Sequence, residues 1–391
     1  MRINTRLAQR LNKINASSTL AITSKAKKLK SEGKAVINFA AGEPDFDTPQ
    51  EIKAFAIEAI NSGFTKYTPS TGTLELKEAI SGKFKKDNNL DYGPSQIVVS
   101  CGAKHSIFNT LFVTVNPGDE VLIPSPFWVS YPEMVNLCQG IPKFIKTSLE
   151  NSFKAHIQDL EKHLSAKTKV LILNSPCNPT GAVYTKNELK DIADLCVKKN
   201  ILVISDEIYE KITYDNLTHY SIASFNKDIY NLTVTINGLS KSHSMTGWRI
   251  GYLGGPADIV EAISRLQDHT TSNPASISQK AALKALSLPQ ESTKNMAVEF
   301  EKRRNYILKR LANNKIISFC RPQGAFYIFC DISKSKMDSG TFSSRLLDET
   351  LVAVIPGESF GRDDYIRMSF ATSSKDIEEG INRIENWLTN I

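Results

Sequence analysis

Residues 169–209 read KVLILNSPCNPTGAVYTKNELKDIADLCVKKNILVISDEIY, and this stretch decides the fold. Short runs of apolar, mostly β-branched residues stand near its two ends, at 169–173 and 201–204, with a helical pattern between them. Runs of this kind are typical of strands buried on both faces, and two parallel strands need a crossover, usually a helix, to join them. The stretch therefore predicts a strand-helix-strand unit in a mainly parallel sheet.

The same alternation extends on both sides of this unit, from about residue 95 to residue 255. Further apolar runs lie at 97–100, 120–123 and 231–236, and residues 103–115 carry a helical pattern that Asn116-Pro117-Gly118 ends. We expect an α/β core in which a mainly parallel, mixed sheet lies between helices.

The pattern changes after about residue 285. A charged helical stretch at 299–312 precedes two segments that resemble strands, at 325–331 and 365–370. We interpret residues 46–285 as a large domain and residues 286–391 as a smaller α+β domain, to which the N-terminal segment 1–45 returns.

Composition narrows the function classes. The chain has 391 residues, of which 41% are hydrophobic and 23% charged, and a formal net charge of +7, which excludes a disordered or fibrous polymer. The basic excess is too diffuse to indicate nucleic-acid binding. The cysteines form no C-x-x-C pair and the histidines form no H-E-x-x-H motif, so we expect neither a metal site nor a disulfide framework. Because disulfides are not indicated, we expect a cytoplasmic location. No apolar run reaches the roughly 18 residues that span a membrane.

The N-terminus allows two interpretations. The first acidic residue is Glu32, and the basic stretch before it has a composition that organelle transit peptides share. Ile3, Leu7, Leu11 and Ile14, however, recur at helical spacing, which favours a docked first helix.

Polar residues follow the apolar runs, and ligands of open α/β sheets bind beyond the carboxyl ends of strands. We therefore expect the chemistry in the segments 100–104, 124–128, 174–181, 205–209 and 237–241. Lys241 is the notable member, because a desolvated lysine among cations is pushed towards its neutral, nucleophilic form. A lysine among the polar residues of these segments indicates amine chemistry on a carbonyl group.

Several ordered motifs resemble those of class I aminotransferases, which use pyridoxal 5′-phosphate and have fold type I. They are Gly-Glu-Pro-Asp-Phe-Asp-Thr-Pro at 42–49, Asn-Pro-Thr-Gly at 178–181, Asp-Glu-Ile-Tyr at 206–209 and Ser-Lys-Ser-His-Ser-Met-Thr-Gly-Trp-Arg-Ile-Gly-Tyr at 240–252. The resemblance extends from about residue 17 to residue 372.

This resemblance implies a catalytic role for Lys241, which would hold the cofactor covalently and, once displaced by the substrate, move the proton between Cα and the cofactor carbon. Asp206 would pair with the protonated ring nitrogen. Asn178 and Tyr209 would donate hydrogen bonds to the phenolic oxygen of the ring.

The cofactor phosphate would bind at the start of a helix formed by Gly102, Ala103 and Lys104, with Ser240 and Arg249 completing its site. By the same resemblance, Trp128 would stack on the cofactor ring. Tyr67 would reach the phosphate of a partner subunit, so a homodimer with shared active sites is expected.

For the substrate, the resemblance implies that Arg367 grips the α-carboxylate, assisted by the backbone of Gly42, with Asn178 and Trp128 beside it. Lys104 and Thr19 match the lysine/threonine pattern of the bacterial-type group that accepts a second carboxylate. We expect aspartate or glutamate as donor and a 2-oxo acid such as 2-oxoglutarate or oxaloacetate as acceptor, with ping-pong kinetics.

Three alternatives stay open. Enzymes with the same lysine and threonine pattern also accept prephenate and form arogenate, with or instead of aspartate activity. The scaffold likewise supports β-lyases, which would release pyruvate and ammonia. A ligand-sensing regulator would need an additional N-terminal DNA-binding domain, and the family resemblance already begins near residue 17.

Overall fold

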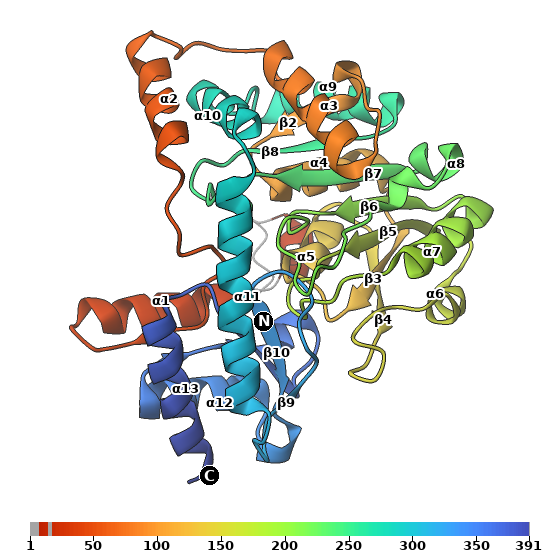
Figure 1. Ribbon diagram of the computed structural model, residues 1–391. Coiled ribbons are helices and arrows are strands. Elements are labelled where there is room, and N and C mark those ends of the chain that lie inside the picture. The colour runs from red at the N-terminus through yellow and green to blue at the C-terminus, as the bar shows by residue number, and fades with distance from the viewer. Residues whose placement is uncertain (1–7, 15–17, 391) are drawn as a thin grey trace.

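The computed structural model describes residues 8–14 and 18–390. Its largest element is a seven-stranded sheet (Figure 1). β8 runs antiparallel to both of its neighbours and the other pairs are parallel, so the predicted mainly parallel, mixed sheet is confirmed. In spatial order the strands are β2 (Ile97–Ser100), β8 (Gly251–Gly254), β7 (Thr233–Gly238), β6 (Leu202–Asp206), β5 (Thr168–Asn174), β3 (Glu120–Ser125) and β4 (Ile141–Lys146).

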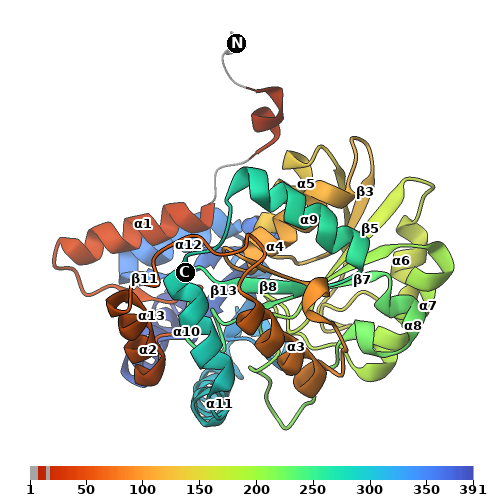
Figure 2. The same cartoon turned by 90° about the horizontal axis from the view of Figure 1, so that it is seen from above.

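Helices cover both faces of this sheet (Figure 2). Because successive side chains of a strand point to opposite faces, Val98 packs with one helical layer, and Ile97 and Val99 pack with the other. The first layer is α4 (Ala103–Thr114), α5 (Ser130–Leu137) and α9 (Ala257–Thr270). The second is α2 (Gln50–Asn61), α3 (Leu74–Asn88), α6 (Ile157–His163), α7 (Lys186–Lys199), α8 (Lys227–Tyr230) and α10 (Ser276–Ser287).

The unit at 169–209 folds as its sequence predicts, into β5, α7 and β6. Thr185 caps α7 by accepting a hydrogen bond from the backbone N–H of Glu188 at 3.3 Å, and the Glu188 carboxylate accepts one from the N–H of Thr185 at 2.7 Å. Asn200 ends the helix in the left-handed conformation, with φ at 52°.

A smaller antiparallel sheet lies below the large one in Figure 1. Its strands are β12 (Ile355–Pro356), β13 (Tyr365–Ser369), β10 (Tyr327–Asp331) and β9 (Ser318–Phe319). β1 (Ile37–Asn38) pairs with β11 (Val352–Ala353), so the N-terminal segment does return to the C-terminal part of the chain. The helices of this region are α1 (Ser18–Ser31), α11 (Glu291–Leu311), α12 (Ser339–Thr350) and α13 (Ser374–Leu388). The domain limits at residues 45 and 285 stay a prediction.

Some boundaries differ from the sequence-based ones. β10 begins at Tyr327 rather than at residue 325, because Ala325 has a φ of 55°, which breaks an extended strand. α11 begins earlier than expected, at Glu291.

The structure describes only the second half of the N-terminal helix expected from Ile3 to Ile14. Residues 1–7 lie outside the described part of the chain, and the first described element is a short 3₁₀ helix, Gln9–Lys13. Leu11 is 46% exposed, so the described residues do not bury its apolar side chain. Further 3₁₀ helices are Pro94–Gln96, Ile222–Ser224, Ser333–Ser335 and Gly357–Phe360. Across 8–14 and 18–390, no helix has the length and apolar character needed to cross a membrane.

Candidate active site

Three neighbouring strands of the large sheet end at one rim, where the sequence places its polar residues. Asn174 at the end of β5 lies opposite Asp206 at the end of β6, which lies opposite Ile236 of β7. Asn178 follows β5 and Lys241 follows β7, so both emerge at the same edge of the sheet as Asp206. The parallel register thus brings together residues that are far apart in the sequence.

The amine of Lys241 lies half-buried at this rim. Its Nζ donates a hydrogen bond to the carbonyl oxygen of Gly42 at 2.5 Å and lies 5.9 and 5.8 Å from the ring centroids of Tyr209 and Phe326. Burial lowers the pKa of this amine to about 8, an effect that the carboxylate of Glu43 opposes. Near neutral pH, therefore, the neutral, nucleophilic fraction of Lys241 is larger than that of an ordinary lysine.

The carboxylate of Asp206 is 4% exposed and receives one hydrogen bond on each oxygen. The hydroxyl of Tyr131 donates to Oδ2 at 2.6 Å, and the backbone N–H of Ile208 donates to Oδ1 at 3.2 Å. Burial raises the pKa of Asp206 to about 6, and the bond from Tyr131 opposes that rise. Both donors are uncharged, so a cationic group on a bound molecule would stabilise this carboxylate further.

The N-terminus of α4 and Arg249 form a crowded, basic corner beside the rim. Gly102 precedes the helix with a φ of 91°, and a Cβ on it would collide with the guanidinium of Arg249. A Cβ on Gly251 would collide with the backbone nitrogen of Ala103. Arg249 is fixed by hydrogen bonds to two backbone carbonyls, at 3.0 and 3.2 Å, and Ser240 is buried. Free N–H groups at a helix start and a forked cation suit an anion such as phosphate.

Arg367 connects the small sheet to the rim. The side chain is 3% exposed; its Nη1 donates to Oδ1 of Asn178 at 3.0 Å, and its Nη2 donates to the carbonyl of Ala40 at 3.0 Å. The guanidinium lies 4.3 Å from the ring centroid of Tyr327, whose hydroxyl is 2.9 Å from that of Tyr209. The Nε of Arg367 is buried without a partner, and such a donor requires an acceptor that a bound anion would supply.

Lys104 and Trp128 lie together. The ammonium of Lys104 sits 4.9 Å from the centroid of the Trp128 ring. Burial, and the nearby Arg249, lower the pKa of Lys104. Two cations on this side of the rim create a positive field that favours anionic ligands.

Known proteins resemble this chain over most of its length. Residues 34–384 match the family model described as aminotransferase class I and II. The chain belongs to this family. Its similarity to individual members covers almost its whole length, and the predicted fold type I is confirmed by solved aspartate aminotransferases.

Three relatives illustrate the similarity. An "Aspartate aminotransferase" of Bacillus sp. (strain YM-2) is 48% identical, over 98% of this chain and 99% of its own length. A "Probable aspartate/prephenate aminotransferase" of Rickettsia conorii is 46% identical, over 98% of each chain. The solved aspartate aminotransferase of Thermus thermophilus with maleate is 38% identical, with a TM-score of 0.93, and the match covers 99% of this chain and 100% of that one.

One expected residue of this aminotransferase lies away from the rim, and the side chain of another is not described. Tyr67 is on the surface and 91% exposed. Thr19 belongs to the first turn of α1, and its side chain lies outside the described part of the chain. The structure brings the others to the rim or to its basic corner.

Sequence reasoning missed two tyrosines at the rim, Tyr131 and Tyr327. Tyr131 comes one helical turn after Trp128, and its ring meets that of Trp128 edge-on, with centroids 5.3 Å apart. The spacing of three residues from Trp128 could have indicated that Tyr131 lies on the same face of the helix. Nothing local in the strand 327–331 distinguishes Tyr327 from a core residue.

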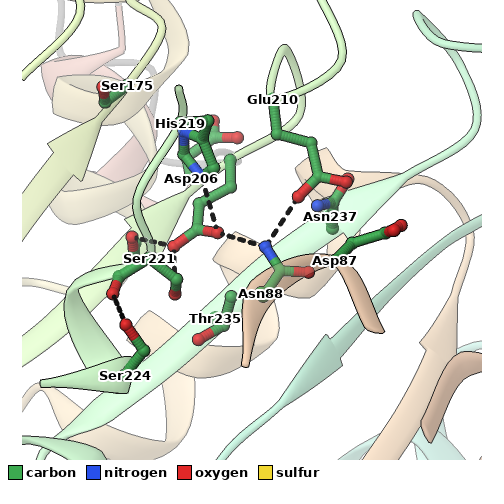
Figure 3. A network of polar contacts seen from close by, with 12 residues as sticks. Asp87, Asn88, Ser175, Asp206, Glu210, His219, Ser221, Ser224, Thr235 and Asn237 are labelled. Atoms are coloured by element: carbon green, nitrogen blue, oxygen red, sulfur yellow. Dashed lines mark hydrogen bonds and ion pairs between the residues drawn. The ribbon is translucent and has the colours of Figure 1, made fainter. Parts of the chain in front are cut away.

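A buried polar network lies behind Asp206 (Figure 3). Glu207, Glu210 and His219 come within 4.8 Å of one another, a spacing that could hold a metal ion. Their oxygens already have donors, however: Asn88 bonds to both carboxylates, at 3.0 and 2.7 Å, and the ammonium of Lys83 contacts Glu210. Because an ammonium already neutralises Glu210, we interpret the network as structural.

Proposed function

We propose that this aminotransferase uses pyridoxal 5′-phosphate to move the amino group of aspartate, or of glutamate, to a 2-oxo acid such as 2-oxoglutarate. The observation that carries the proposal is the joint presence at one rim of an amine with a pKa of about 8, a buried carboxylate and an arginine with an unpartnered Nε. The names of the relatives support aspartate as donor, and the Thermus aminotransferase was solved with maleate, a dicarboxylate like aspartate.

The residues present fit this cofactor. Lys241 offers an amine to an aldehyde, and buried Asp206 offers an anion to a protonated ring nitrogen. We assign the phosphate to the corner formed by Gly102, Ala103, Lys104, Ser240 and Arg249. Trp128 would cover one face of the ring.

When bound, the cofactor supplies a carbonyl carbon that bonds to amines and a ring that accepts electrons from the substrate Cα. The Nζ of Lys241, once free, would carry the proton from Cα of the substrate to the carbonyl carbon of the cofactor in one half-reaction, and in the opposite direction in the other. Asp206 keeps a negative charge against the ring nitrogen, which holds the ring electron-poor. Asn178 and Tyr209 orient the ring through its phenolic oxygen.

We assign substrate binding to groups on both sheets. Arg367 would bind the α-carboxylate through its fork, with the backbone of Gly42 assisting. Lys104 would bind the second carboxylate together with Thr19, with Trp128 beside them. An amino acid without a second carboxylate would leave Lys104 without its anion, which gives the preference for dicarboxylic donors.

The homodimer is part of the proposal. Tyr67 is 91% exposed, an unusual environment for a tyrosine, and a partner subunit's phosphate site would cover it. A cytoplasmic location also belongs to the proposal and is supported by the six free cysteines, since disulfides are rare in that compartment.

A second candidate activity is the amination of prephenate to arogenate, with or instead of aspartate activity. The observation that favours it is the Rickettsia relative, whose name includes prephenate. Prephenate carries a second carboxylate, so the proposed role of Lys104 would serve both substrates.

A donor and acceptor panel tests the proposal. Aspartate, glutamate, alanine and phenylalanine are each paired with 2-oxoglutarate and with prephenate. We expect aspartate and glutamate to give the highest kcat/KM, with parallel double-reciprocal lines that indicate a ping-pong mechanism. Release of pyruvate and ammonia from serine or cysteine, which carry a leaving group on Cβ, would instead identify a β-lyase, and no turnover of aspartate would refute the proposal.

A further inference from the structure

Asp206 is held by Tyr131, a residue outside the set proposed to touch cofactor or substrate. We propose that Tyr131 is a positioning residue, which keeps the Asp206 carboxylate ionised and in one orientation towards the ring nitrogen of the bound cofactor. This inference rests on the proposed function, because it concerns the same site and gives Asp206 its proposed partner.

The geometry is that of a strong, charge-assisted hydrogen bond. Tyr131 lies in the first turn of α5 and is 2% exposed, and its hydroxyl is 2.6 Å from Oδ2 of Asp206. The other oxygen of the carboxylate already accepts the N–H of Ile208. With one fixed donor on each oxygen, the plane of the carboxylate is determined before the cofactor binds.

The charges around Asp206 show why this bond is needed. Glu207, the next residue, raises the pKa of Asp206, as burial does, whereas Lys241 lowers it. Cys177 and Tyr209, from the segments after β5 and β6, also face the carboxylate. Among the side chains that the structure describes, only that of Tyr131 donates a hydrogen bond to Asp206, so its hydroxyl is what opposes burial and Glu207 most directly.

The side chain of Glu207 is held in place beside Asp206 by hydrogen bonds. It accepts hydrogen bonds from the hydroxyls of Ser205 at 2.8 Å and Ser221 at 2.7 Å, and from Asn88 at 3.0 Å, in the network drawn in Figure 3. These donors fix the Glu207 carboxylate next to Asp206, where its charge raises the pKa of Asp206. Tyr131 itself remains a donor, because burial and Asp206 raise the pKa of its phenol well above the usual range.

The test is the dissociation constant of pyridoxal 5′-phosphate from pH 5.5 to 9, measured by fluorescence titration of the full-length protein. Tyr131→Phe removes the hydroxyl and keeps the ring that packs on Trp128. Without this donor the pKa of Asp206 rises, so the pH below which affinity falls should move up by about 1–2 units, and affinity should recover at high pH. The acid limb of kcat/KM for aspartate should move in parallel.

Tyr184→Phe is the matched control. Tyr184 is also buried in the large domain, and its hydroxyl accepts a hydrogen bond from the backbone N–H of Ala155 at 2.9 Å rather than contacting Asp206. Its removal costs stability but should leave both pH profiles where they are in the wild type. An unshifted profile in folded Tyr131→Phe would overturn the inference.

Asp206→Asn separates this inference from the proposed function. We expect this variant to bind the cofactor weakly at every pH and to lose the acid limb. If it does so while Tyr131→Phe keeps the wild-type midpoint, only the role of Tyr131 is wrong. If Asp206→Asn binds as the wild type does, the assignment of Asp206 fails and the role of Tyr131 fails with it.

Discussion

Nη1 of Arg367 donates a hydrogen bond to Oδ1 of Asn178 at 3.0 Å, which ties a strand of the small sheet to the loop after β5 of the large one. The same guanidinium holds the carbonyl of Ala40, so three separate segments of the chain meet at one cation. Its Nε is buried without a partner, and a bound anion would supply the acceptor that such a donor requires. Arg367, which joins these three segments, is thus also the residue proposed to bind the substrate carboxylate.

Arg367→Lys tests that role, because lysine keeps the charge but loses the planar fork. We expect kcat/KM to fall about 100-fold for every amino donor, mostly through a higher KM, since all donors share the α-carboxylate. Steady-state kinetics with aspartate and phenylalanine check this. Arg362→Lys is the control, because Arg362 pairs with Asp364 at 2.7 Å, away from the rim; an equal loss there would show a general effect on folding.

Lys241 should give covalent attachment of pyridoxal 5′-phosphate a defined pH dependence. Only the neutral amine reacts, so the attachment rate should rise about tenfold per pH unit and level off near the pKa of about 8. Stopped-flow absorbance on cofactor-free protein measures it. In Lys241→Ala, borohydride should fix no cofactor at the site and transamination should be lost, whereas the surface variant Lys227→Ala should behave as the wild type. Turnover retained in Lys241→Ala would identify another lysine.

The sequence predicted the rim better than its surroundings, for a physical reason. Buried parallel strands are nearly continuous apolar runs, so the polar residues after them, such as Asp206 and Lys241, stand out in one dimension. β4 and β8 carry no such signal. β4 is an edge strand with Pro142 and exposed positions, and β8 is four residues long and begins and ends with glycine.

The contacts that tune the rim were harder to predict, because they depend on how separate elements pack. The bond between Tyr131 and Asp206 requires the placement of α5 over the end of β6, and the contact of Asn88 with Glu207 requires that of α3. Local patterns report which residues are buried, but not which buried residues from distant segments meet.

Lys104→Leu tests the choice of substrate. A charged hydrogen bond to the second carboxylate is worth about 1.5–3 kcal/mol, so kcat/KM for aspartate and glutamate should fall about 10- to 100-fold. The kcat/KM values for alanine and phenylalanine, which lack that carboxylate, should change little. The measurement is therefore the ratio of kcat/KM for aspartate to that for alanine, and the monocarboxylic donors serve as the control. Equal losses on all four donors would place Lys104 in cofactor binding alone.

The buried pair of Lys83 and Glu210 should matter to stability rather than to chemistry. Burial alone would raise the pKa of Glu210, but Lys83 and Lys211 lower it to about 2, so the ionised carboxylate is stabilised by these cations. Lys83→Met removes the one of these cations that contacts the carboxylate directly, and the free energy of unfolding in urea should fall by about 3 kcal/mol. Adding Glu210→Gln should recover most of the loss, because it removes the buried charge.

The pH dependence of this effect has a definite sign. A carboxylate with a depressed pKa stabilises the fold above its ordinary value of 4.5, and this contribution disappears as the pH falls towards about 2. The gap between wild type and Lys83→Met should therefore narrow in acid. Lys85→Met, on the same helix, removes an exposed pair with Asp91 at 3.1 Å and should cost less than about 1 kcal/mol at any pH. Equal costs for the two lysines would mean that burial of Glu210 does not control the effect.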